Sequence, residues 1–276
     1  MKLRVVELLL VTTVPTMVLA EQGWPSLLLM AVTLAGGTLA AGGANAINMY
    51  IDRDIDKLMV RTQNRPLVTG ALTPRAAMIF AIALEIVAFG VLWAGANLLA
   101  AVLAVSATLF YVFVYSLWLK RTSKQNIVIG GAAGAMPVLV GWAAVTNSLG
   151  WTPVVLFVVI FLWTPPHFWA LAIRYADEYK AAGVPMMPVV VSLERTVRSM
   201  TAYAVLLTIS TLVLIPVANL GWIYGITALV FGVAFVIGAV RLGSDPSEKR
   251  AMRLFAFSIT YVTAIFVALT VDVLLR

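Results

Sequence analysis

The residues best suited to chemistry lie in the stretch from Asn45 to Arg75, which begins in an apolar segment and ends in a run of charge. On a helix, at about 100° per residue, four polar side chains of this stretch fall within an arc of roughly 80°. These four are Asn45, Asn48, Asp52 and Asp56. Two carboxylates and two amides therefore share one stripe, whereas Asp54 points to the opposite side. Oxygen atoms of this kind are the ligands that a hard cation such as Mg²⁺ prefers.

A cluster of cationic side chains accompanies this polar stripe. Its members are Arg53, Lys57, Arg61, Arg65 and Arg75. Carboxylates that hold a metal ion, with arginines just beyond them, predict a site for a metal-bound oxyanion such as diphosphate. Arg61 and Arg65 are four residues apart, so on a helical turn they would present two guanidinium groups together. The alternative is that these cations only orient the protein in a membrane.

A second group of candidates surrounds the basic loop formed by Lys120, Arg121 and Lys124. This loop either binds an oxyanion or only sets membrane topology. Tyr111 and Tyr115 precede it, one helical turn apart. They are either interfacial aromatic residues or part of a cavity in which ring faces stabilise a carbocation.

A third group begins with the segment Thr164–Trp169, which reads TPPHFW and contains the only histidine, His167. Its two prolines remove backbone donors, so we expect the helix to bend or break there. His167 is either a satisfied polar group, an iron ligand or a base. Asp177 follows in the next charged segment, and the chain between Asp52 and Asp177 is long enough for four membrane spans. We therefore expect both acids to face the same side, in a site built from both halves of the chain.

The elements that must position these residues are membrane helices. The hydrophobic fraction is 62% and only 11% of the residues are charged, which excludes a soluble domain of this size. We predict an all-α, polytopic bundle of nine transmembrane helices in a single domain spanning residues 1–276. The expected spans are 5–20, 24–51, 76–94, 98–118, 127–145, 151–173, 197–215, 220–240 and 253–274.

The distribution of charge supports this helix count. All 19 lysines and arginines except Arg276, including Lys2 and Arg4, fall at alternate connections between the expected spans. By the positive-inside rule, the N-terminus and the charged loops face the cytoplasm, as does the site they contain. The basic composition is thus explained by a cytoplasmic membrane surface, and we expect no nucleic acid partner.

Several of these segments resemble a known family. NMYIDRDIDKLMVRTQNRPLVTG resembles the first aspartate-rich motif, N-x-x-x-D-x-x-x-D, of the UbiA superfamily of intramembrane prenyltransferases. WLKRTSKQNIVIGGAAGAMPVLVGW, TPPHFWALAI and AGVPMMPVV are similar to signature segments of one branch, the protohaem IX farnesyltransferases. The likeness covers nearly the whole chain.

The resemblance implies a Mg²⁺-dependent enzyme that joins the farnesyl group of farnesyl diphosphate to a vinyl group of haem B. It implies metal ligation by Asn48, Asp52, Asp56 and Asp177, and catalytic roles for Asp52, Asp56, Arg61, Arg65 and His167. The implied substrate-binding residues are Asn48, Arg61, Arg65, Tyr111, Tyr115, Lys120, Arg121, Lys124, Asn126, His167, Trp169 and Arg174. It further implies contact with a haem A synthase or with terminal oxidase assembly.

Two features depart from the family pattern. The second motif of the superfamily is often D-x-x-x-D, but Ala181 stands four residues after Asp177, so the acidic pair here is Asp177 and Glu178. The branch also begins with more residues than the Met1–Arg4 segment found here. Two rival functions stay open: prenylation of an aromatic quinone precursor, and secondary transport. Transporters place their polar residues near the membrane midplane, whereas these residues gather at one end.

Overall fold

The computed structural model describes residues 3–276, with side chains from Val11 onward, so the side chains of Lys2 and Arg4 lie outside the described part. The helices are α1 (Leu3–Glu21), α2 (Leu27–Ile51), α3 (Arg53–Leu58), α4 (Pro66–Thr69), α5 (Pro74–Gly95), α6 (Leu98–Leu109), the π-helix η1 (Phe110–Leu119), α7 (Lys120–Thr122), α8 (Asn126–Thr146), α9 (Trp151–Arg174), α10 (Ala176–Ala181), α11 (Met187–Val190), α12 (Leu193–Ala218), α13 (Trp222–Ser244) and α14 (Glu248–Leu274). The described residues contain no β-strand, which confirms the all-α prediction.

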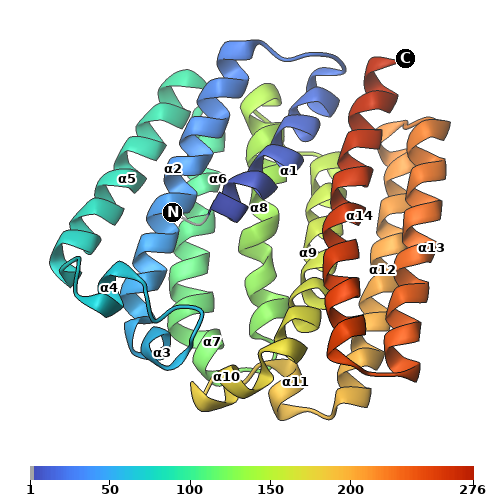
Figure 1. Cartoon of the computed structure of the whole chain (residues 1–276). Helices are drawn as coiled ribbons and strands as arrows, with labels where there is room; N and C mark the ends of the chain where they lie inside the picture. The colour runs from blue at the N-terminus through green and yellow to red at the C-terminus, as the bar shows by residue number, and fades with distance from the viewer. Residues whose placement is uncertain (1–2) are drawn as a thin grey trace.

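The long helices stand side by side as a membrane bundle (Figure 1). In the described part of the chain, eight helical stretches are long and apolar enough to cross a membrane, with α6, η1 and α7 together forming one of them. The remaining long helix, α1, packs against α8 and α14 inside the bundle. The protein is therefore a multi-pass membrane protein. The expected count of nine spans holds approximately, since the structure has these eight candidate spans and α1 is not among them.

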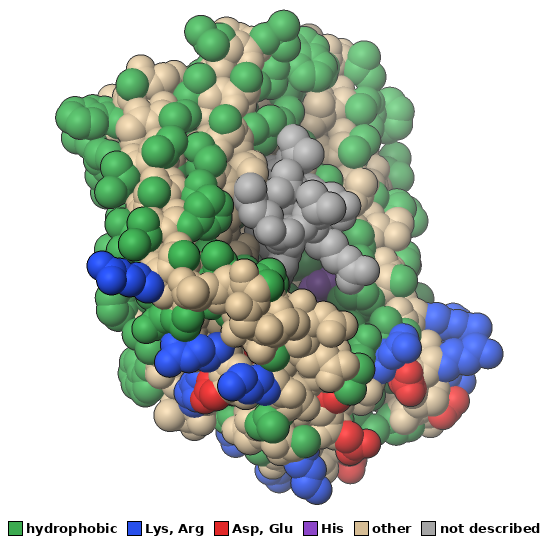
Figure 2. All heavy atoms as spheres, turned by 60° about the vertical axis from the view of Figure 1, so that its left-hand side comes forward, with side chains coloured by type: hydrophobic (Ala, Val, Ile, Leu, Met, Phe, Trp, Pro, Cys, Tyr) green, Lys and Arg blue, Asp and Glu red, His purple; other side chains and the backbone are tan. Residues whose placement is uncertain are grey.

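The short helices gather at one end of the bundle, where α3, α4, α7, α10 and α11 lie together (Figure 1). The charged side chains visible in Figure 2 gather at this same end, while the flanks of the bundle are covered by hydrophobic side chains. Below, we call this region the charged end. It is the only part of the described bundle in which short helices lie between the long ones, so it is where loops and helix ends can build a site.

Local sequence signals explain where several helices begin. Thr73 caps α5 by accepting a hydrogen bond from the backbone N–H of Ala76, and Pro74 occupies the first helical position. At the opposite end of the bundle, the buried carboxylate of Asp272 on α14 accepts hydrogen bonds from the backbone N–H groups of Gly221 (2.6 Å) and Tyr224 (3.3 Å). Asp272 therefore caps α13 from a neighbouring helix, a role that its position in the sequence did not reveal.

Glycines allow the helices around the site to approach closely. A β-carbon at Gly43 of α2 would collide with Glu85 of α5, and one at Gly130 of α8 would collide with the ring of Tyr115. Gly131, next in sequence, makes room for Thr164 of α9 in the same way. Small residues thus place α8 between η1 on one side and α9 on the other.

The two prolines of α9 do not interrupt it. The helix runs without a break from Trp151 to Arg174 and includes Pro165 and Pro166. Of the expected bend or break, the break is absent, and both prolines are buried where α9 packs against α8, α12 and α14.

Candidate active site

The polar stripe of α2 continues through the end of that helix. Asp52 separates α2 from α3, yet the backbone hydrogen bonds continue through it. Its N–H donates to the backbone carbonyl of Asn48 (2.9 Å), and its own carbonyl accepts from the backbone N–H of Asp56 (2.8 Å). The i to i+4 hydrogen bonds therefore keep Asn48, Asp52 and Asp56 one turn apart, as predicted. All three side chains are buried, and the Asp52 side chain is 0% exposed.

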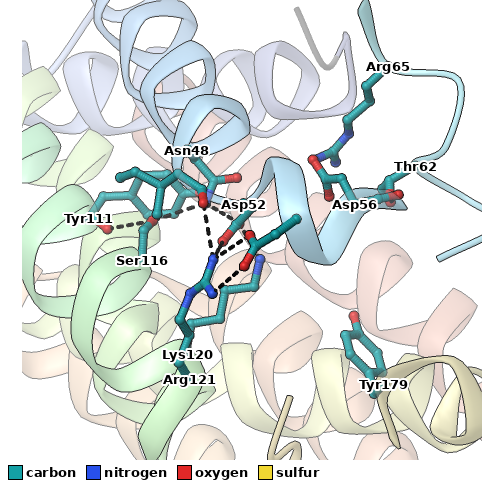
Figure 3. Close-up of polar contacts among 12 residues, drawn as sticks. Asn48, Asp52, Asp56, Thr62, Arg65, Tyr111, Ser116, Lys120, Arg121 and Tyr179 are labelled. Carbon is teal, nitrogen blue, oxygen red and sulfur yellow. Dashed lines mark hydrogen bonds and ion pairs between the residues drawn. The ribbon is translucent and has the colours of Figure 1, made fainter. Parts of the chain in front are cut away.

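Asp52 lies at the centre of a buried polar network (Figure 3). One of its oxygens, Oδ2, accepts a hydrogen bond from the Asn48 amide (2.7 Å) and forms an ion pair with the ammonium group of Lys120. The same Asn48 amide nitrogen lies 3.0 Å from the hydroxyl oxygen of Ser116. The second oxygen, Oδ1, has Arg121 at 3.9 Å but no hydrogen-bond partner within the described residues. Asp52 thus has one occupied and one free oxygen.

The π-helix η1 sets the position of Ser116 and Lys120. Its i to i+5 hydrogen bonds give a wider turn than an α-helix, about 4.4 residues, so residues four and five apart lie on one face. The Ser116 hydroxyl donates to the carbonyl of Tyr111, five residues earlier (2.9 Å). The rings of Tyr111 and Tyr115 are stacked, with centroids 5.3 Å apart. The two tyrosines, one helical turn apart in the sequence, therefore lie on the same face of η1.

Asp56 and the following arginines form the second part of the site. Arg65 binds the buried carboxylate of Asp56 at 2.5 Å, whereas Arg61 donates to the hydroxyl of Tyr179 on α10 at 3.3 Å. The two guanidinium groups therefore have different partners and do not point together as a helical turn would place them. The reason is Pro66: a residue before proline is driven out of the α-helical region, and Arg65 is extended, with ψ 143°.

The Arg61–Tyr179 contact joins the two halves of the chain. Arg61 lies in the loop after α3, and Tyr179 lies on α10, after the sixth expected span. Arg61 also lies over the ring of Tyr175, 5.7 Å from its centroid. Tyr179 points from α10 toward the group formed by Asp52 and Asp56 in Figure 3. The structure therefore brings the first acidic stripe and the segment after α9 to the same end of the bundle, as predicted.

Asp54 has a separate role at the protein surface. It points away from the stripe, is 62% exposed, and receives two hydrogen bonds of 2.7 Å from the guanidinium of Arg121. That guanidinium holds the pKa of Asp54 well below its ordinary value. Arg121, a predicted substrate-binding residue, is thus paired mainly with Asp54 and Ile51 at the surface.

Three other predicted substrate-binding residues form no hydrogen bond or ion pair with Asp52 within the described residues. Lys124 is exposed in the loop before α8. Arg174 is exposed at the end of α9 and pairs with Glu248 at 3.3 Å. Trp169 is buried where α9 packs on α12, with its ring 5.6 Å from that of Tyr203. Its indole N–H is buried and has no hydrogen-bond partner within the described residues.

Asn126, the remaining candidate at this end, is fully buried at the start of α8. Neither its amide nitrogen nor its amide oxygen has a hydrogen-bond partner within the described residues. Because buried amides are almost always paired, Asn126 is the kind of residue that a polar ligand would satisfy.

The second acidic segment, on α10, presents two carboxylates of different burial. Asp177, the predicted metal ligand, is exposed, whereas its neighbour Glu178 is half-buried and has one buried oxygen without a hydrogen-bond partner. The described residues contain no group of three or more acidic or histidine side chains close enough to hold a metal ion. The orphaned oxygens of Asp52 and Glu178 are nevertheless hard ligands of the type that Mg²⁺ takes.

His167 lies in a separate, aromatic part of the bundle. Its ring is stacked between Trp163 and Phe255, with centroid distances of 4.2 and 4.5 Å. The Ser258 hydroxyl lies 2.6 Å from His167 Nδ1 and donates its proton to the carbonyl of Phe255 at 2.6 Å. Ser258 has only one proton, so its oxygen accepts from the imidazole, and Nδ1 carries the imidazole proton.

The consequence is that Nε2 of His167 presents a lone pair. Within the described residues Nε2 has no hydrogen-bond partner. The imidazole, the purple side chain in Figure 2, is visible between the surrounding side chains. It can therefore accept a hydrogen bond, take a proton or bind a metal such as haem iron. The role of Ser258 was not apparent from the sequence, in which it is one hydroxyl among many on an apolar helix.

Together, the helices and the site define a multi-pass membrane protein with buried acids and cations at one end. The same fold occurs in solved structures: a digeranylgeranylglyceryl phosphate synthase has a TM-score of 0.82 at 18% identity, covering 99% of this chain and 95% of that one. A UbiA homologue from Archaeoglobus fulgidus bound to GPP and Mg²⁺ has a TM-score of 0.67 at 19% identity, with 97% of each chain covered.

The sequence matches the UbiA prenyltransferase family over residues 9–262, and the chain belongs to this family. It is 56% identical to a protoheme IX farnesyltransferase of Parafrankia sp. (strain EAN1pec), over 100% of this chain and 89% of that protein. It is 54% identical to a protoheme IX farnesyltransferase of Frankia alni, over 98% of this chain and 95% of that protein. The similarity therefore extends over the whole bundle, including the charged end.

Proposed function

We propose that this protein transfers the farnesyl group of farnesyl diphosphate to a vinyl group of haem B and releases diphosphate. In this reaction the C–O bond of the allylic diphosphate breaks and a C–C bond forms to one vinyl carbon. Water supplies a hydroxyl group to the other vinyl carbon with loss of a proton, giving haem O. The choice of haem B as acceptor is supported by the full-length similarity to protoheme IX farnesyltransferases.

The buried acids are the residues suited to hold Mg²⁺ with the diphosphate. Asn48, Asp52 and Asp56 would supply oxygens from α2 and α3, and Glu178 would supply one from α10, where its neighbour Asp177 is exposed. Support comes from the unpartnered oxygens of Asp52 and Glu178, and from a family member solved with GPP and Mg²⁺. When bound, Mg²⁺ would supply charge neutralisation at the phosphate oxygens.

The cations that now hold the acids would act on the leaving group. Lys120 and Arg65 are paired with Asp52 and Asp56, and Arg61 lies beside Tyr179 at the same end. Their charge would stabilise diphosphate as its C–O bond breaks. Removing one well-placed donor of this kind typically costs about 3–4 kcal/mol of transition-state stabilisation.

The remaining residues would handle the two apolar reactants. The stacked rings of Tyr111 and Tyr115 lie on η1, whose Ser116 contacts Asn48 of the stripe, and they can stabilise an allylic cation through their faces. The apolar bundle would shield this cation from water until the vinyl carbon attacks. His167, with its free Nε2 and flat aromatic neighbours, is the residue suited to contact the porphyrin or its iron.

The proposed setting is the cell membrane, with the charged end and the N-terminus facing the cytoplasm. The gathering of lysine and arginine at one end of the bundle supports this orientation by the positive-inside rule. Contact with a haem A synthase or terminal oxidase assembly stays a prediction.

The test is to incubate the purified protein in lipid nanodiscs with haem B, farnesyl diphosphate and Mg²⁺, and to analyse the haem by mass spectrometry. We expect a haem that has gained one farnesyl group and one hydroxyl group. Parallel reactions contain a hydroxybenzoate or a naphthoate in place of haem B. Prenylation of an aromatic acid with no modified haem would refute the proposed acceptor, while no transfer to any acceptor would refute the reaction class.

A further inference from the structure

A groove between α13 and α14 lies outside the proposed site. It has a volume of about 620 Å³ and is lined at the charged end of the two helices by Arg241, Arg250 and Arg253. Its remaining lining is apolar and includes Ile237, Leu254 and Phe257. The face of α14 that carries Phe255 and Ser258 packs instead on His167. The groove is thus separate from the residues proposed for catalysis.

The three arginines differ in how they are held. Arg250 donates to the carbonyl of Arg241 (2.7 Å) and pairs with Asp245 (3.1 Å), so it is fixed at the edge of the groove. Arg241 and Arg253 are exposed, and neither has a carboxylate partner among the described residues. The groove therefore carries two uncompensated positive charges beside one neutralised arginine.

We propose that this groove binds an anionic phospholipid of the surrounding leaflet. The phosphate would lie against Arg241 and Arg253, and one acyl chain would lie along Ile237, Leu254 and Phe257. The basic and apolar parts of the groove match the head and tail of a lipid. The phosphate would lie at the charged end of the bundle and the acyl chain along its apolar flank. Basic pockets between transmembrane helices bind anionic head groups for this reason.

The position of the groove favours a lipid over a soluble anion. Figure 1 shows α13 and α14 at one edge of the bundle, on the side away from α2 and α5. An edge groove opens toward the bilayer, where lipid is the most abundant molecule. A soluble phosphate would use the arginines alone and would leave the apolar floor uncovered.

The test is native mass spectrometry of the detergent-solubilised protein with phosphatidylglycerol or phosphatidylcholine. We expect the wild type to retain one phosphatidylglycerol and to prefer it to phosphatidylcholine. The double variant Arg241→Gln/Arg253→Gln should bind phosphatidylglycerol about 10- to 30-fold more weakly, since each cation near an anionic lipid contributes severalfold to affinity. Ala234→Phe fills the groove without changing charge and should also weaken retention.

The matched control neutralises two cations at the same end but outside the groove, as Arg195→Gln/Lys249→Gln, and should keep wild-type retention. Thermal unfolding of each variant shows whether the fold is intact. Equal losses in the control and the groove variants would refute the site, as would equal retention of the two lipids. Inorganic phosphate binding that depends on Arg241 and Arg253, while lipid retention does not, would refute the lipid as occupant.

Discussion

Replacing Asp52 with asparagine removes a buried negative charge while keeping the size and shape of the side chain. Asp52 is 0% exposed and is paired with Lys120, whose side chain is 16% exposed. The substitution breaks a charge-assisted contact and leaves that ammonium group without its carboxylate. A hydrogen bond to a charged group is worth about 1.5–3 kcal/mol, so we expect the free energy of unfolding to fall by about that amount.

The effect on catalysis should be larger than the effect on stability. If Asp52 helps to bind the metal and diphosphate, its loss should lower kcat by about 10²- to 10³-fold, as for other electrostatic groups in active sites. The assay is farnesyl transfer to haem B at a temperature well below the unfolding midpoint of the variant. A folded Asp52→Asn protein with near-normal kcat would refute the assignment of this residue.

The matched control is Asp54→Asn, which changes the same kind of side chain two residues away. Asp54 is 62% exposed and is paired with Arg121 at the surface, away from the buried stripe. We expect Asp54→Asn to keep activity within about twofold, since exposed ion pairs contribute about 0–1 kcal/mol. Equal losses of activity in Asp52→Asn and Asp54→Asn would mean that activity depends on the charge of this segment in general and not on the buried stripe.

A binding readout separates ligand recognition from the chemical step. Mg²⁺ with inorganic diphosphate should raise the unfolding midpoint of the wild type, because a ligand at 100 times its Kd stabilises the folded state by about 2.7 kcal/mol. Asp52→Asn should lose this shift and Asp54→Asn should keep it. A shift that survives in Asp52→Asn would place the diphosphate elsewhere.

Three further predictions concern residues outside the first stripe. Glu178→Gln should raise the Mg²⁺ concentration needed for half-maximal activity, while Asp177→Asn, at an exposed position, should not. If only Asp177→Asn raises this concentration, Asp177 is the ligand and Glu178 is not. Asp272→Asn should weaken the cap of α13 and lower the free energy of unfolding by about 1 kcal/mol, measured by denaturation, with kcat unchanged at low temperature. Ser258→Ala frees the ring of His167 to carry its proton on either nitrogen and should change the absorption spectrum of bound haem B, with KM for farnesyl diphosphate unchanged; Ser258→Thr, which keeps the hydroxyl, should restore the spectrum.

Much of the first acidic stripe could be predicted from the sequence because it depends only on helical period. Asn48, Asp52 and Asp56 are four residues apart, and the hydrogen-bonding pattern carries that spacing through the end of α2. The same reasoning placed Asp54 on the opposite side, where it pairs with Arg121. The all-α architecture followed from apolar length alone, because a bilayer requires helices that satisfy their own backbone.

Other parts of the site depend on local backbone geometry, which the helical period of the sequence alone does not indicate. The expected pairing of Arg61 with Arg65 assumed a helical turn, but Pro66 drives Arg65 into an extended conformation. That signal was present in the sequence. The π-helix that places Ser116 and Lys120 beside Asp52 had no such signal, since Phe110–Leu119 is apolar enough for an ordinary membrane helix.

The second acidic motif shows what a family pattern leaves undecided. Asp177 and Glu178 are adjacent, so the motif alone does not say which of them is the ligand. On a helix, however, their side chains point about 100° apart. Only the orientation of α10 decides which one is buried, and that orientation is set by tertiary contacts such as Arg61 with Tyr179. Trp169 is a similar case, because its contact with Tyr203 depends on how α9 packs against α12.

The pairing of each buried acid with a cation explains how the site can be stable both empty and filled. A lone buried carboxylate is strongly unfavourable, and Lys120 and Arg65 remove that penalty at Asp52 and Asp56. A metal ion on the carboxylates would take over this neutralising role, and the two cations could then turn to the phosphate oxygens. Each of the four side chains would thus have a partner of opposite charge both before and after binding. Lys120 and Arg65 are also partly exposed, at 16% and 18%, so they can move between these partners without crossing the apolar core.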